Sequence, residues 1–390
     1  MMKTLTIALS LAFAAVIGCG NSDTVKIGFV GPMTGDAAQY GKLMSQAVKL
    51  AADEKNAAGG IGGRKISVVV EDDEAKVDKG NAAIEKLTGV DKIYGLVGAV
   101  FSSVSLAIAP KAEATKTIMI SPSSTHKDLP KKGRYIFRTI MSDSVQAEVF
   151  AKYVAQVAQI KTVAVLYIKN DYSQGLAEDF KTVYEKEGGK VIAMETGIQG
   201  DKDFKTQLTK IKGLKPEALY IPNYVAEMAQ ILEQANQLGL KAKILSADGY
   251  SNPEIFKLAG KLADGVVFSN TESDNAAVSE KFKADYMKKW GKEPDAFSFN
   301  SYDAANILIN AIEKVYNASS DAEKREWKLD REKILAEVAA TKNYPGVSGM
   351  ITFINNDVAK NIGIYRTESG KKVLLKKYTL DAAGKLVEAK

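Results

Sequence analysis

Short apolar runs alternate along the chain with longer segments in which apolar residues recur every three to four positions. Residues 25–31 form an apolar run, and residues 32–39 form a turn-rich loop. The next segment has the spacing of one apolar helix face, made by Tyr40, Leu43, Met44, Ala47, Val48 and Ala51. Glycines between 59 and 63 end this helix in a turn, and a second apolar run follows at 65–70. The pattern predicts a strand, a helix and a strand in succession.

The same alternation continues to about residue 270. Further strands are predicted at 93–97, 117–120, 135–139, 163–168, 191–195, 218–222, 244–246 and 266–268. The helices between them are predicted after Phe101, over 145–157, from Gln174, over 204–211 and over 225–238. Two consecutive series of strand–helix–strand units indicate an α/β protein with two mainly parallel sheets covered by helices.

The last 120 residues follow a different pattern. Helices are predicted at 278–290, 302–316 and 333–340, and strands at 350–354, 362–366 and 372–378. Because this segment has few parallel units, we expect it to complete the two preceding halves rather than to form a third domain.

The first segment has the pattern of a targeting sequence. Lys3 supplies positive charge, and residues 5–18 form an apolar stretch too short to span a bilayer comfortably, which predicts a signal peptide over 1–18. The residues at 16–19, Val-Ile-Gly-Cys, resemble the lipobox of bacterial lipoproteins, in which Cys19 becomes the lipidated first residue. Residues 19–24 would then be a lipidated tether that anchors the protein to a membrane. The alternative is an ordinary signal peptide with an incidental cysteine.

Composition excludes several classes of function. The 53 Lys and Arg are mixed with 47 Asp and Glu, giving a net charge of +6 without a basic cluster, so no nucleic-acid partner is expected. One cysteine and one histidine leave no internal disulfide and no cysteine-based zinc site. Motifs for a nucleophile elbow, a Walker A loop or a zinc protease are missing from the sequence. We therefore expect that the protein is not an enzyme and that it binds neither a metal ion nor a cofactor.

Four loops follow predicted strands, where ligands collect in open α/β sheets. They span residues 98–103, 121–125, 223–224 and 247–250. Each also has a purely structural explanation. Ser102 or Ser103 could cap a helix, the serines of 121–125 could bond their own backbone, Tyr224 could be packing, and Asp248 with Gly249 could be an ordinary turn.

Taken together, the loops combine hydroxyls and helix-end amides with one carboxylate, Asp248. Aromatic residues accompany them at Tyr40, Phe101, Tyr172, Tyr224 and Phe297. A zwitterion needs hydrogen-bond donors for its carboxylate, a negative group for its ammonium and an apolar wall for its side chain. This set of groups therefore predicts a site for an α-amino acid.

Several stretches carry a family resemblance through their order and spacing. They are Gly31-Pro32-Met33-Thr34-Gly35, Ala38-Gln39-Tyr40-Gly41, Ala58-Gly59-Gly60-Ile61, Glu71-Asp72-Asp73 and residues 224–232. From residue 25 to about 363, the chain resembles the leucine/isoleucine/valine-binding proteins, which are substrate-binding subunits of ABC importers. The resemblance implies a type I periplasmic-binding fold with two Rossmann-like lobes, parallel sheets flanked by helices and three hinge crossings. It also implies a permease partner and a location on the periplasmic or extracellular face of a bacterial membrane.

The resemblance assigns roles to individual residues. It implies that Ser102, with Ser103 beside it, binds the ligand carboxylate, and that Ser123 and Thr125 supply a carbonyl and a hydroxyl. Asp248 takes the position of the acid that binds the ammonium, where some relatives have glutamate. Phe101 stands near a position where some relatives have a disulfide. The aromatic walls fall at Tyr40, Tyr172, Tyr224 and Phe297.

These implications lead to one expected function and two alternatives. We expect a monomer that captures an L-amino acid, branched-chain or aliphatic, between an N-terminal lobe (25–142 and 271–345) and a C-terminal lobe (143–270 and 346–390). The hinges are expected near Ser142, Asn270 and Pro345. A sensor or an amide- or urea-type receptor of the same fold is the first alternative, favoured by a cleft that lacks the acid. A structural surface lipoprotein is the second, and it predicts that the aromatic residues only pack.

Overall fold

The computed structural model describes residues 24–273, 275–381 and 386–389. The expected signal peptide, Cys19 and residues 20–23 lie outside the described residues. Thr24, which we expected to end the tether, is instead the first residue of a strand. In the part of the chain that is described, none of the helices combines the length and the apolar character of a membrane span.

The first sheet consists of five parallel strands in the order β2-β1-β3-β4-β5. The strands are β1 (Thr24–Gly31), β2 (Lys65–Asp72), β3 (Gly95–Gly98), β4 (Ile118–Ser121) and β5 (Ile136–Arg138). They are connected by α1 (Ala38–Ala57), α2 (Val77–Gly89), α3 (Ser102–Ala114) and a short 3-10 turn at Pro130–Lys132. Consecutive strand residues point to opposite faces of the sheet. Phe29 belongs to an apolar cluster with α1, and Val30 belongs to another cluster with α2 and α3, so both faces are buried.

The second sheet is mixed and has the order β17-β16-β15-β10-β9-β8-β6-β7. Its parallel part consists of β6 (Thr162–Ile168), β7 (Lys190–Gly197), β8 (Ala218–Tyr220), β9 (Lys243–Ser246) and β10 (Val267–Glu272). Its antiparallel part consists of β15 (Asn361–Glu368), β16 (Lys371–Leu380) and β17 (Leu386–Glu388). The helices are α4 (Asp143–Lys152), extended by a π-helical turn (Tyr153–Val157), α5 (Asp171–Lys186), α6 (Lys205–Leu214), α7 (Val225–Gln237) and α8 (Glu254–Ala259), with 3-10 turns at Asp248–Ser251 and Gly260–Ala263.

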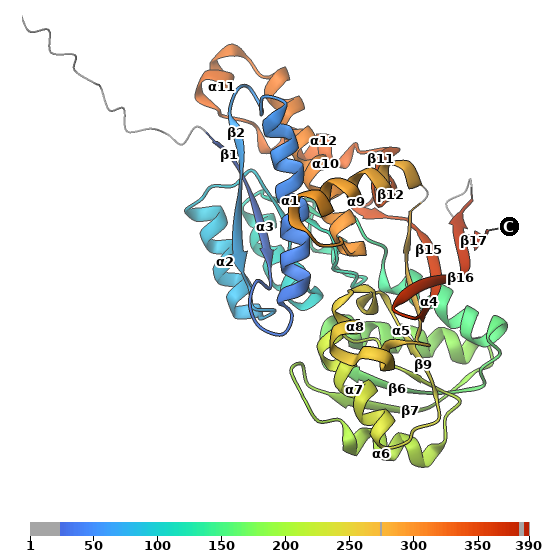
Figure 1. Cartoon of the computed structure of the whole chain (residues 1–390). Helices are drawn as coiled ribbons and strands as arrows, with labels where there is room; N and C mark the ends of the chain where they lie inside the picture. Colours follow the sequence, from blue (N-terminus) through green and yellow to red (C-terminus); the bar gives the residue numbers. More distant parts are fainter. Residues whose placement is uncertain (1–23, 274, 382–385, 390) are drawn as a thin grey trace, which may run out of the picture.

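The remaining helices lie with the first sheet, as Figure 1 shows. They are α9 (Ala276–Trp290), α10 (Ala296–Ala318), α11 (Asp321–Glu326) and α12 (Arg331–Ala339). Helix α10 packs along α1 and against α12, β3 and β4. Two small hairpins follow, β11 (Tyr344–Gly346) with β12 (Gly349–Ile351), and β13 (Phe353–Ile354) with β14 (Asp357–Val358).

Residues 346–358, which we expected in the C-terminal lobe, pack against the first lobe. The Asp303 carboxylate on α10 accepts hydrogen bonds from the backbone N–H groups of Val347 and Ser348, each at 2.8 Å. Arg138 of β5 forms a two-point ion pair with Asp357 of β14. The chain therefore enters the second sheet only at Asn361.

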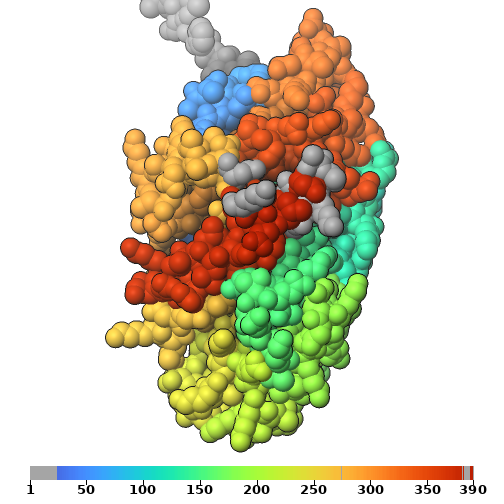
Figure 2. Space-filling view, turned by 90° about the vertical axis from the view of Figure 1, so that its right-hand side faces the viewer, coloured from blue at the N-terminus to red at the C-terminus, as the bar shows by residue number. Residues whose placement is uncertain are grey.

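The molecule has two lobes, one for each large sheet, and this confirms the predicted fold class (Figure 1). The chain passes between the lobes before α4, after β10 and before β15. Asn270, which we predicted as a hinge, lies inside β10 and pairs with Gly363 of β15. Figure 2 shows the C-terminal strands, in red, crossing the molecule between the orange helices of the first lobe and the green segment of the second.

Candidate ligand-binding site

Seven of the ten side chains expected to bind a ligand line one cavity between the lobes. They are Tyr40, Phe101, Ser123, Tyr172, Tyr224, Asp248 and Phe297. Most of them follow strands directly, because the carboxyl ends of parallel strands meet at one edge of a sheet and the edges of the two sheets face each other. The cavity measures about 10 Å³, which is about the space that one water molecule needs.

Aromatic rings fill most of the space between the lobes at this point. The ring of Phe101, which precedes α3, stacks on the ring of Tyr224, which precedes α7, with centroids 3.9 Å apart and planes 3° from parallel. Tyr172 stacks on the same Tyr224 ring at 4.9 Å. Tyr40 meets Phe101 edge-on at 5.7 Å and lies 6.0 Å from Phe297. The aromatic residues selected from the sequence therefore meet at one place between the lobes.

Two hydrogen bonds also join the lobes at the cavity. The buried hydroxyl of Tyr40, on α1, donates to the carbonyl oxygen of Gly249 at 2.7 Å. It also accepts a hydrogen bond from the backbone N–H of Val225 at 3.2 Å. Tyr40 therefore contacts two loops of the second lobe from a helix of the first.

Asp248 begins the 3-10 turn after β9 and is fully buried. Its Oδ1 accepts hydrogen bonds from the Tyr172 hydroxyl at 2.7 Å, from Gln146 Nε2 at 3.1 Å and from the Gly249 N–H at 3.1 Å. Its Oδ2 has no hydrogen-bond partner in the ranges that the structure describes. Burial raises the pKa of Asp248, and the hydrogen bonds from Tyr172 and Gln146 oppose the rise. This carboxylate is therefore held in place with one oxygen open to a cationic donor.

The hydroxyl groups lie on the first-lobe side of the site. Ser102 is the first residue of α3, and its buried Oγ has no partner. Neither Ser102 nor Ser103 caps the helix, because the N-cap is Phe101 and no side chain makes a capping bond. Ser103 lies outside the small cavity, and its Oγ accepts a hydrogen bond from the Asp171 N–H of the second lobe at 3.1 Å.

The loop 121–125 is fixed to the loop before α3 by its serines. Ser121 Oγ donates to the Ala99 carbonyl at 2.8 Å, and Ser123 Oγ donates to the Val100 carbonyl at 2.7 Å. Ser121 Oγ also accepts from the Ser124 N–H at 3.0 Å, which is the local turn bond considered as the structural explanation. Thr125 is buried behind the cavity, and its hydroxyl has no hydrogen-bond partner of good geometry.

The sequence analysis missed three residues that support the site, all near the start of α4. Gln146 contacts both the side chain and the backbone of Asp248. Its Nε2 donates to Asp248 Oδ1 at 3.1 Å, and its Oε1 accepts from the Asp248 N–H at 3.1 Å. Arg138 is fully buried and donates to the carbonyl oxygens of Thr125 and His126. The pKa of the buried Asp143 is raised, first by burial and second by the charge of Asp248, while the Thr125 hydroxyl opposes the rise. The rule that selected the other loops applies equally to the loop 139–142 after β5 and to the start of α4, which holds Asp143 and Gln146.

A wider pocket of about 660 Å³ adjoins the cavity and shares Tyr40, Phe101 and Tyr224 with it. The lobes also meet around this pocket, through an exposed ion pair between Lys202 and Asp36 at 2.5 Å. Within the described ranges, no group of three or more His, Cys, Asp or Glu side chains is placed to hold a metal ion.

Comparison with known proteins gives a consistent result. A family model described as periplasmic binding protein matches residues 24–372. The Leu/Ile/Val-binding protein BraC3 of Rhizobium johnstonii is 32% identical over 375 residues, which are 95% of this chain and 98% of that protein. The crystal structure of the leucine-binding protein LivK of Thermotoga maritima is 31% identical with a TM-score of 0.82, covering 90% of this chain and 98% of that one. LivJ of Streptococcus pneumoniae, solved in complex with isoleucine, is 28% identical with a TM-score of 0.81. The match covers 94% of this chain and 100% of that chain. The chain belongs to the periplasmic binding protein family, among the relatives of the leucine/isoleucine/valine-binding proteins.

Proposed function

We propose that this protein captures an L-amino acid with a branched-chain or aliphatic side chain between its two lobes and delivers it to the permease of an ABC importer. The observation that carries the proposal is the buried Asp248 carboxylate, with one oxygen open, in a cavity walled by aromatic rings. An ammonium group is the ligand group that would pair with this oxygen. The ligand carboxylate would bind the Ser102 hydroxyl and the N–H groups at the start of α3.

The ligand enters when the lobes separate, because the closed cavity is too small for an amino acid. Separation breaks the Phe101–Tyr224 stack and the hydrogen bond from Tyr40 to Gly249, since each joins the two lobes. Closure around the ligand removes water from its charged groups and so strengthens their contacts with Asp248 and Ser102. The aromatic rings would then contact the ligand side chain.

The proposal also includes the boundaries between the lobes and a lipid anchor at Cys19. We place the first lobe boundary near residue 142, as expected, and the second after β10 ends at Glu272 rather than at Asn270. The third crossing lies between Val358 and Asn361, because residues 346–358 contact the first lobe. We propose lipidation of Cys19 after cleavage of residues 1–18, which would hold a monomeric binding protein on the outer side of a bacterial membrane beside its permease.

A thermal-shift screen tests the amino-acid proposal. The mature protein, refolded from denaturant to remove bound ligand, is melted with each of the twenty amino acids. A ligand at 100 times its Kd stabilises a protein by about 2.7 kcal/mol, which corresponds to a shift of a few degrees. We expect leucine, isoleucine and valine to raise the melting temperature, and the absence of any shift across the panel would refute the proposal.

Two analogues of leucine separate this function from its alternatives. 4-Methylpentanoate lacks the ammonium group, and leucinamide lacks the carboxylate. We expect both to lose the stabilisation, because each leaves one buried polar group of the site without a partner. An amide receptor would instead respond to leucinamide or to simple amides. A purely structural protein would respond to none of these compounds.

A further inference from the structure

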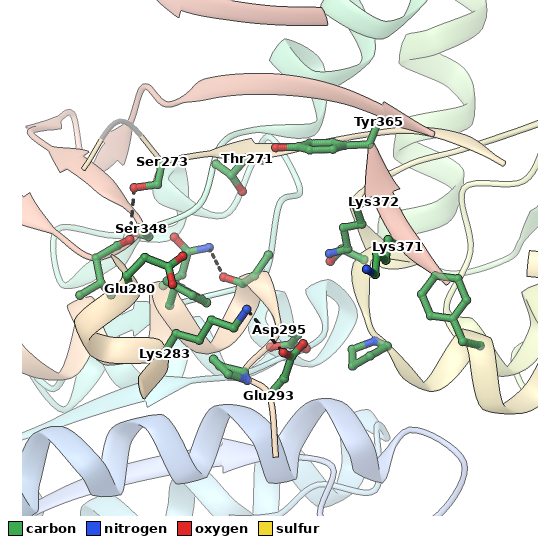
Figure 3. Close-up of a pocket in the computed structure, with 18 of the residues that line it drawn as sticks. Thr271, Ser273, Glu280, Lys283, Glu293, Asp295, Ser348, Tyr365, Lys371 and Lys372 are labelled. Carbon is green, nitrogen blue, oxygen red and sulfur yellow. Dashed lines mark hydrogen bonds and ion pairs between the residues drawn. The ribbon is translucent and has the colours of Figure 1, made fainter. Parts of the chain in front are cut away.

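A second large cavity lies between the lobes, apart from the proposed amino-acid site. It measures about 730 Å³, a size typical of small-molecule sites, and none of the ten predicted site residues lines it. One wall comes from α9, α10 and the loop between them, in the first lobe. The other wall comes from the end of β10, the turn 248–251 and the β15–β16 hairpin, in the second lobe (Figure 3).

Two lysine side chains of the second lobe line this cavity. Figure 3 shows Lys371 and Lys372, at the start of β16, extending their ammonium groups into it. Neither ammonium has an ion pair or a hydrogen bond within the part of the chain that the structure describes. Lys372 is exposed as a residue, but its ammonium lies close enough to surrounding protein that burial lowers its pKa to about 8. It therefore remains mostly charged at neutral pH.

The acidic residues of the cavity are engaged elsewhere or lie at its rim. Glu293 pairs with Lys283 at 3.4 Å. The buried Asp295 carboxylate caps α10 by accepting from the Ser298 N–H at 2.9 Å, and it accepts from Asn252 Nδ2 at 3.1 Å. Glu280 is exposed on α9. Among the described residues, no acid lies within ion-pair distance of Lys371 or Lys372. The charges of Asp295, Glu272 and Glu293 still act on Lys372 and oppose the fall in its pKa.

Two hydroxyl groups of the cavity also lack partners. The Oγ of Ser251, a residue that is 1% exposed, has no hydrogen bond. The buried Oγ1 of Thr271 likewise has none, and Figure 3 shows it pointing into the cavity. Buried hydroxyls are nearly always hydrogen-bonded in folded proteins, so both hydroxyls are available to donate to a ligand in this cavity. Apolar surface lies beside them on Phe256 and Phe299.

We propose that this interlobe cavity binds a small organic anion. Its carboxylate would lie between the ammonium groups of Lys371 and Lys372 and accept a hydrogen bond from Thr271. Its apolar body would pack against Phe256 and Phe299. Lysines outside any ion pair, hydroxyl donors without a partner and an apolar surface, all lining one cavity, are the groups that such a ligand requires.

Isothermal titration with benzoate tests this site, because benzoate joins a carboxylate to a flat apolar body. We expect one binding event on the mature protein at pH 7 and none with the neutral amide, benzamide. The double variant K371A/K372A should bind benzoate at least tenfold more weakly. Both side chains are exposed, so the variant should fold, and circular dichroism with a melting curve verifies this.

Two further variants make the result specific. K376A/K377A removes two charges from the same strand outside the cavity lining, and it should keep the wild-type affinity for benzoate within twofold. Asp248→Asn should do the same, because Asp248 does not line this cavity. Failure of wild type to bind benzoate at millimolar concentration would overturn the proposal. So would equal loss in both lysine pairs, or loss in Asp248→Asn but not in K371A/K372A.

Discussion

Asp248→Asn is the sharpest test of the amino-acid site, because it changes charge with almost no change in shape. Asparagine can keep an acceptor oxygen where Oδ1 now accepts from Tyr172, Gln146 and Gly249. The amide NH₂ then takes the position of Oδ2, which has no hydrogen-bond partner among the described residues. The ligand ammonium would therefore meet a donor where the wild-type protein offers a carboxylate oxygen.

The size of the effect follows from the burial of Asp248. Its side chain is fully buried, so solvent does not screen its interaction with a bound ammonium. Removing one partner of a buried ion pair costs about 3–5 kcal/mol, because the other charge stays buried and unpaired. At about 1.4 kcal/mol for each factor of ten, the affinity for leucine should fall roughly 100- to 5,000-fold.

The same substitution should have the opposite effect on the protein without ligand. Burial raises the pKa of Asp248, so its charged form is disfavoured in the folded protein. Asparagine removes that cost, and the unfolding free energy at neutral pH should stay equal or increase. A lower melting temperature together with weaker binding would instead indicate simple damage to the fold.

Titration calorimetry with leucine and thermal denaturation at pH 7 measure both effects. Asp264→Asn is the matched control, because it removes an exposed carboxylate that lies outside the cavity. It should bind leucine as the wild type does. If Asp248→Asn bound leucine within threefold of wild type, Asp248 would not be the ammonium partner.

Three other substitutions test separate parts of the structure. Burial raises the pKa of Asp73 from 3.8 to about 7, so the folded protein loses stability as the pH rises from 3.8 to 7. Asp73→Asn should therefore raise the unfolding free energy, measured in urea, by up to about 4 kcal/mol at pH 8 and by little at pH 4. An equal gain at both pH values would contradict this explanation. Tyr40→Phe removes the buried hydrogen bond to Gly249 and should weaken leucine binding by about 1–3 kcal/mol. Stopped-flow measurements should show this as faster leucine dissociation. An unchanged dissociation rate would show that this hydrogen bond does not stabilise the closed lobes. Lys202→Ala removes only the exposed pair with Asp36 and should change binding by less than about 1 kcal/mol in calorimetry, so a tenfold loss would show that this pair holds the lobes together.

The sequence predicted elements wherever apolar residues repeat with a clear period. The strands β1 and β6 and the helices α1 and α7 were found because their buried faces consist of large apolar residues. Helix α2 was missed because two of its four buried positions are only Gly80 and Ala83. Helix α11 buries none of its residues, so no apolar face marks it in the sequence.

The site was predictable as a set of loops but not as a set of contacts. The position of Asp248 after a strand was sufficient to select it, whereas its hydrogen bond to Gln146 joins residues 102 positions apart. Ser103 bonds to the second lobe rather than lining the cavity, because the helix turn that buries Ser102 directs its neighbour outward. The stack of Phe101 on Tyr224 depends on how the lobes meet, and no local pattern contains that information.

The balance between open and closed lobes follows from what closure buries. The Phe101–Tyr224 stack favours contact between the lobes by about 0.5–1.5 kcal/mol beyond its buried area. Closure without ligand also leaves the Asp248 Oδ2 and the Ser102 hydroxyl buried without partners, which opposes contact. Changing an equilibrium from 1:99 to 99:1 needs about 5.5 kcal/mol of preference for one state. Leaving the buried Asp248 charge unpaired costs about 3–5 kcal/mol, and leaving the buried Ser102 hydroxyl unpaired costs about 1–3 kcal/mol. A ligand supplies the required preference only by removing both costs. On the proposed function, a ligand with both charged ends would therefore close the lobes, and a ligand that lacks either end would leave them largely open.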